Sequence, residues 1–105
     1  MKLLSSEIAS TIPKLYEQEG LGNAAIVHAK FFLPGSNWTW YVIEYDGDDL
    51  CFGLVVGMET ELGYFAISEL ESLETSIGME VERDLDWQPI NLGEVRQRIA
   101  KDGLA

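Results

Sequence analysis

The chain has few of the residues from which metal sites and nucleophilic active sites are built. Its 105 residues include one cysteine, Cys51, and one histidine, His28. A single cysteine excludes an intrachain disulfide, and this pair offers no recognisable zinc-ligand spacing. A small hydrolase would have to rest on His28, Cys51 or a serine without any surrounding catalytic motif. The sequence therefore predicts no metal and no cofactor, and it favours a non-enzymatic protein.

Long apolar runs are also missing. No stretch approaches the roughly twenty apolar residues that span a bilayer. The apolar run after Met1 stops at Ser5, short of a signal peptide. The hydrophobic content of 47% is nevertheless ordinary for a globular protein. The expectation is a cytoplasmic protein of one domain, residues 1–105, without a membrane partner.

Basic residues are scarce. The chain has 7 Lys and Arg against 18 Asp and Glu, and between Glu44 and Asp86 its one base is Arg83. The net charge of -11 repels nucleic-acid phosphates, which argues against direct DNA or RNA binding. The acids either favour solubility or form a patch that meets a basic protein. The candidate patch consists of Asp46, Asp48, Asp49, Glu59 and Glu61.

Three helices are expected from capping residues and apolar spacing. The first is capped by Ser5 or Ser6 and is interrupted at Pro13, whose ring disfavours helical geometry at the preceding residue. A short second helix begins with the capping box Ser68–Glu71. The third begins at Asn91, ends at Gly103 and buries three apolar side chains at helical spacing, Leu92, Val95 and Ile99.

Strands are expected over residues 24–33, 37–45, 50–58, 63–67 and 81–87, from their β-branched and aromatic content. Short connections between successive strands favour an antiparallel meander. The predicted fold is α+β: an antiparallel meander sheet of four to five strands, with the N-terminal and C-terminal helices packed on it.

The hairpin of residues 37–58 has two contrasting faces. Tyr45 pairs with Asp48 or with Leu50, and both registers place the same side chains on the same face. The bulky face, assigned to the core, carries Tyr41, Ile43, Tyr45, Phe52, Leu54, Val56 and Met58. The opposite face carries Trp38, Trp40, Val42, Glu44, Cys51, Gly53, Val55 and Gly57.

On the second face, large tryptophans oppose glycines, which are unfavourable in strand interiors. Either the indole rings lie across the glycines beneath a covering helix, or a ligand occupies a shallow groove there. In the second case the candidate binding face comprises Trp38, Trp40, Glu44, Gly53 and Gly57.

The chain resembles a family of small bacterial proteins of unknown function, often encoded on plasmids and conjugative elements. The resemblance covers nearly the whole chain and rests on Leu15–Gly20, Ala29–Phe32, Ser36–Tyr41, Phe52–Val55, Glu61–Phe65, Glu69–Glu71 and Glu82–Asp84. It implies a genomic neighbourhood of DNA transfer, and it assigns no activity and no catalytic residue.

Two hypotheses follow for the function. The favoured one is a non-enzymatic acidic protein that acts on a basic partner, which the resemblance implies is a DNA-handling protein. The alternative is a module that binds a small ligand or peptide on the face of Trp38 and Trp40.

Overall fold

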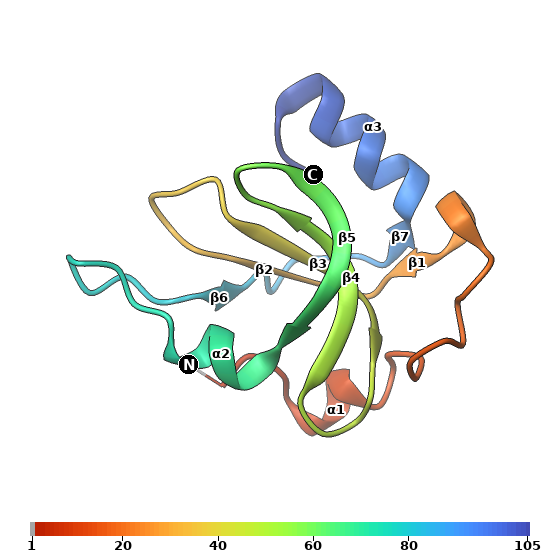
Figure 1. Cartoon of the computed structure of the whole chain (residues 1–105), viewed down its shortest axis with the longest axis horizontal. Coiled ribbons are helices and arrows are strands. Elements are labelled where there is room, and N and C mark those ends of the chain that lie inside the picture. The colour runs from red at the N-terminus through yellow and green to blue at the C-terminus, as the bar shows by residue number, and fades with distance from the viewer. Residues whose placement is uncertain (1) are drawn as a thin grey trace.

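A computed structural model describes residues 2–105 (Figure 1). Its main sheet has five antiparallel strands in the order β5-β4-β3-β2-β6. Four of them follow one another as a meander, and β6 pairs with the outer edge of β2. The bounds are β2 (Ala29–Phe32), β3 (Thr39–Tyr45), β4 (Leu50–Val56), β5 (Thr60–Ala66) and β6 (Glu82–Arg83). The predicted α+β fold with an antiparallel meander is confirmed.

Two apolar cores lie against opposite faces of this sheet. On the first, which we call the α2 face, α2 (Ile67–Ser72) and the segment around α1 (Ser6–Ala9) cover the buried side chains Phe31, Trp40, Val42 and Cys51. On the second, the α3 face, α3 (Leu92–Asp102) packs on Tyr41, Ile43 and Leu54. Figure 1 shows α3 on the opposite side of the molecule from α1 and α2.

Three smaller elements complete the α3 face. The strands β1 (Ile26–Val27) and β7 (Ile90–Asn91) form a separate two-stranded sheet, and η1 (Gly22–Ala24) is a single 3-10 turn. The predicted strand 24–33 is therefore divided at His28, because β1 pairs with β7 while β2 pairs with β3. Within residues 2–105, none of the helices has the length and apolar character needed to cross a membrane.

The helix predictions have mixed outcomes. As predicted, the Asn91 side chain accepts from the Glu94 amide at 2.8 Å, and Gly103 ends α3 at φ 75°. The first helix is shorter than expected: Ser5 caps it, but it ends at Ala9. The capping box is wrong, because α2 already begins at Ile67 and a different residue caps it.

That residue is Asp49, in the turn between β3 and β4. Its carboxylate accepts from the Ser68 amide at 2.8 Å and from the Ser68 hydroxyl at 2.6 Å. A carboxylate satisfies the free amides of a first helical turn as well as a local side chain does. The turn therefore holds the start of α2 from a distance of 19 residues along the chain.

A β-bulge in β3 changes the two faces of the hairpin. Val42 pairs with Gly53 but Glu44 pairs with Phe52, so Ile43 is an extra residue. Beyond the bulge Tyr45 pairs with Cys51, which is neither of the predicted registers. The extra residue breaks the alternation on which the face assignment rested.

Two face assignments are wrong because of this bulge, and a third is wrong for a separate reason. Glu44 lies on the α3 face beside Phe52, and Tyr45 packs against the core of the α2 face. Met58, expected in the core, is 96% exposed because β4 ends at Val56 and Met58 lies in the turn that follows.

Candidate functional site

The two tryptophans of the predicted binding face have different environments. Trp40 is buried beneath α2, in the same cluster as Leu70. Trp38 precedes β3, keeps 38% of its surface exposed and stacks on Trp40 with 6.0 Å between ring centroids. Its ring lies across Gly57, where any Cβ would collide with it. Trp40 is thus a core residue, and Trp38 covers it while staying partly open to solvent.

The other two residues of the predicted face do not join the tryptophans. A Cβ at Gly53 would collide with the backbone of Tyr41, so this glycine permits a close approach of β3 and β4. Glu44 points to the opposite face, where it is 4% exposed and accepts hydrogen bonds from the amides of Tyr16 at 2.9 Å and Gln18 at 2.7 Å.

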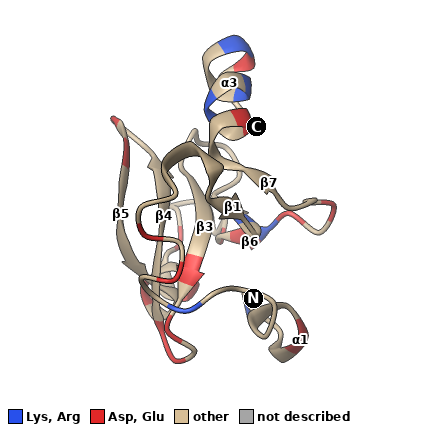
Figure 2. Ribbon diagram, turned by 90° about the vertical axis from the view of Figure 1, so that its right-hand side faces the viewer, with Lys and Arg blue, Asp and Glu red and all other residues tan. Residues whose placement is uncertain are grey.

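The acids of the predicted patch form two separate groups, one at each end of β4. Asp46, Asp48 and Asp49 form the β3–β4 turn, whereas Glu59 and Glu61 lie at the β4–β5 turn. The seven residues of β4 separate the two groups by about 20 Å. Figure 2 shows acidic segments spread over the molecule rather than gathered on one surface.

Asp46 has a structural role within its turn. Its Oδ1 accepts from the amides of Asp48, Asp49 and Leu50 at 2.8, 2.9 and 3.0 Å. These bonds, with that from Asp48 foremost, lower the pKa of Asp46 because they stabilise its charged form. Since Asp49 caps α2, two of the three acids in this turn hold local structure.

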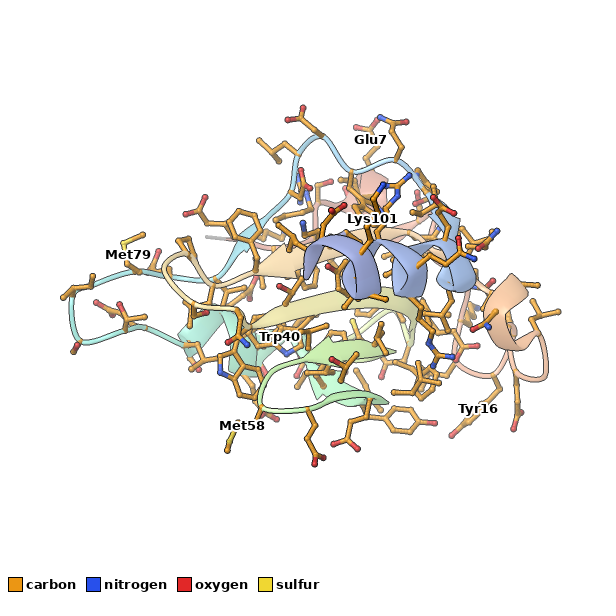
Figure 3. The ribbon with its side chains drawn as sticks, turned by 90° about the horizontal axis from the view of Figure 1, so that it is seen from above. Glu7, Tyr16, Trp40, Met58, Met79 and Lys101 are labelled. Carbon is orange, nitrogen blue, oxygen red and sulfur yellow. The ribbon has the colours of Figure 1, made fainter. Side chains whose placement is uncertain are left out.

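Glu59 and Glu61 do lie beside Trp38. A cavity of about 600 Å³ along β5, which we call the β5 groove, is lined by Trp38, Val55, Met58, Glu59, Glu61, Leu62, Gly63 and Tyr64. The structure therefore brings one tryptophan of the predicted binding face together with two acids of the predicted patch. Figure 3 shows Met58 at the edge of the molecule on the same side as Trp40.

A second cavity lies on the α3 face, and sequence reasoning missed it. This Tyr16 pocket, of about 540 Å³, is lined by the loop of residues 16–22, β3 to β5 and the start of α3, and it is open to solvent on one side. Its lining includes Tyr16, Glu19, Glu44, Phe52 and Tyr64. Tyr16 has φ 73°, a left-handed conformation that non-glycine residues rarely adopt. Only the glycines at 20 and 22 marked this loop in the sequence, and they indicate a turn rather than a pocket.

The comparisons with known proteins give a family. The family model described as "Protein of unknown function (DUF2958)" matches residues 3–101. The chain belongs to this family. The match includes both the β5 groove and the Tyr16 pocket. No curated protein and no solved structure matches the chain.

In this DUF2958 chain, the cysteine considered for nucleophilic chemistry is poorly suited to it. Cys51 is fully buried, and desolvation raises the pKa of its thiol to about 12, so the reactive thiolate is scarce at neutral pH. Burial lowers the pKa of His28. Among residues 2–105, no three His, Cys, Asp or Glu side chains are grouped so as to hold a metal ion.

Proposed function

We propose that this protein is a non-enzymatic interaction protein, and that it binds a basic protein through the β5 groove. The observation that carries the proposal is the convergence of exposed apolar side chains and exposed acids at one end of β4 and β5. Trp38 and Met58 supply the apolar surface, and Glu59 and Glu61 supply the charge.

Both components match what protein partners bury. Tryptophan and methionine are enriched in interfaces, and Met58 is 96% exposed beside the half-open Trp38. Burial of this exposed apolar pair against a partner removes it from water, which makes the free energy of binding more favourable. The neighbouring carboxylates favour a basic surface over an acidic one, and the net charge of -11 speeds the encounter.

The partner class that we propose is a DNA-handling protein. The surface with which such a protein meets phosphates is basic, so an acidic groove complements it. The resemblance to proteins encoded on plasmids and conjugative elements supports the same choice. The alternative function, binding of a small ligand or peptide on the tryptophan face, keeps Trp38 and Gly57 but loses Trp40, Gly53 and Glu44 to structural roles.

The test is a comparison of two double variants with the same net charge. Glu59→Gln/Glu61→Gln removes two charges from the groove, and Glu7→Gln/Glu17→Gln removes two exposed charges elsewhere. Each protein is immobilised, host proteins are captured from lysate at graded salt, and the retained basic proteins are quantified. We expect the groove variant to lose about tenfold in retention and the control variant less than threefold, since close charge pairs outweigh distant ones.

The apolar half of the groove is tested separately. Met58→Ser, at a 96% exposed position, leaves the fold intact and is expected to weaken capture of the same partner. Retention that does not fall as the salt concentration rises, or an equal loss of retention in the two charge variants, would contradict a specific acidic site. Equal losses would instead indicate attraction by the net charge alone.

A further inference from the structure

The Tyr16 pocket lies on the other face of the sheet from Trp38. It shares Leu62 and Tyr64 with the β5 groove, but the tryptophan, methionine and two acids on which the proposed function rests do not line it. Its open side is aromatic. The rings of Phe52 and Tyr64 are 5.0 Å apart and tilted by 56°. The neighbouring Tyr16 side chain is the largest of the influences that raise the pKa of Tyr64. Three aromatic rings from two distant parts of the chain therefore surround one opening.

The charge inside the pocket has one sign. Glu44 and Glu19 line it, and of the residues that the structure describes, those lining the pocket include no Lys, Arg or His. Arg96 is directed elsewhere, since its guanidinium donates to Asn23 Oδ1 at 2.9 Å. Each Glu44 oxygen accepts one amide, and a carboxylate has about four acceptor sites. Glu44 thus keeps acceptor capacity for a ligand.

The loop that closes the pocket is held in place before any ligand arrives. The Gln18 amide group donates to the Ile26 carbonyl at 2.9 Å and the Ile43 carbonyl at 3.0 Å, and accepts from the Ile26 amide at 2.7 Å. Close to Gln18 in the same loop, Tyr16 has φ 73°, and its backbone amide donates to Glu44 Oε1 at 2.9 Å. Strained residues of this kind cluster at ligand sites, and a preformed loop lowers the entropy cost of binding.

We infer that the Tyr16 pocket binds an organic cation, an ammonium or guanidinium group carried on a short aliphatic chain. Aromatic faces attract such cations, and carboxylates beside the rings add to the attraction. The volume of about 540 Å³ lies within the range of small-molecule sites and exceeds the size of a lysine or arginine side chain. The cation belongs either to a free amine or to a side chain of another protein.

The test is an NMR titration of the ¹⁵N-labelled protein with matched probes. Nα-acetyl-lysine amide is compared with Nα-acetyl-norleucine amide, which has the same carbon side chain without the ammonium group, and n-butylammonium is compared with n-butanol. We expect saturable shifts at the amides of Tyr16, Gln18, Glu44 and Tyr64, and binding of each cation about fivefold or more tighter than its neutral counterpart. Stronger binding of the lysine probe assigns the site to a protein side chain, and equal binding assigns it to a free amine.

Two glutamates of one loop provide a matched pair of variants. Both are exposed, but Glu19 lines the pocket and Glu17 does not. Glu19→Gln is expected to weaken cation binding about threefold while Glu17→Gln leaves it unchanged, and Tyr64→Leu is expected to weaken it about fivefold. Equal affinity for lysine and norleucine probes, equal effects of the two glutamate variants, or no saturable shift would overturn the inference. Met58→Ser, in the β5 groove, should not change cation binding, so this site and the proposed function can fail separately.

Discussion

Replacing Glu44 with glutamine is expected to destabilise the protein although the two side chains have nearly the same shape. Glu44 is 4% exposed, and each of its oxygens accepts one backbone amide, from Tyr16 at 2.9 Å and from Gln18 at 2.7 Å. Glutamine retains one oxygen and presents an NH₂ group in place of the other. One amide therefore keeps an acceptor, and the other faces a donor.

The magnitude follows from these two bonds. Exchanging a charge-assisted hydrogen bond for a neutral one costs about 1 kcal/mol, and leaving a buried amide unsatisfied costs about 1–3 kcal/mol. The expected loss is therefore about 2–4 kcal/mol in the free energy of unfolding. That is a large part of the roughly 5–15 kcal/mol that holds an average domain together. For a chain of this length it lowers Tm by roughly 8–16 °C.

Urea unfolding followed by tryptophan fluorescence measures the change, as a lower midpoint with an unchanged slope. Glu17→Gln is the control, because Glu17 is exposed in the same loop and its loss should cost less than about 0.5 kcal/mol. In the Glu44→Gln protein, the amides of Tyr16 and Gln18 should exchange faster with solvent. A variant as stable as the parent, or unchanged exchange at both amides, would refute the assigned role of Glu44.

Three further predictions concern the α2 face. Gly57→Ala is expected to cost about 1–3 kcal/mol, because its Cβ would collide with the Trp38 ring, and altered tryptophan fluorescence with unchanged far-UV circular dichroism would report the displaced indole. Cys51, whose thiol pKa is raised from 9.0 to about 12, should resist iodoacetamide at pH 8 until urea unfolds the protein. The raised pKa also means that stability is intact below pH 9.0 and declines toward about pH 12, an effect that Cys51→Ala should remove. Asp49→Ala should cost about 1 kcal/mol through loss of the α2 cap, measured by urea unfolding, whereas Asp48→Ala should cost little.

The elements that the sequence predicted well are those whose signals are local. The aromatic strand, the acidic turn after it and the capped last helix each carry their own pattern within a few residues. The position of Trp38 across Gly57 could also be anticipated, because a strand glycine opposite a large ring leaves room for that ring.

The features that escaped prediction are fixed by residues far apart in sequence. Nothing near Ser68 shows that Asp49 will cap α2. In the same way, the bulge at Ile43 is accompanied by a hydrogen bond from Gln18, 25 residues earlier. An alternating strand pattern contains no mark of such an insertion, and so the side on which Glu44 lies could not be read from it.

The first strand prediction failed for a related reason. Residues 24–33 form one apolar run, but its two halves pair with different partners, β7 and β3. Apolar content gives the tendency to form a strand and leaves the choice of partner to the rest of the fold.

The extra residue in β3 also affects how members of the family should be aligned. A relative that has lost one residue between Val42 and Glu44 would place its acid directly after Val42 and opposite Phe52, and the acid would therefore stay on the α3 face beside the Tyr16 loop. Its loop would then keep the carboxylate that holds two of its amides. A gap of one residue at Ile43 is therefore compatible with the pocket, and the acid itself, rather than the length of the strand, is the better guide to which relatives retain it.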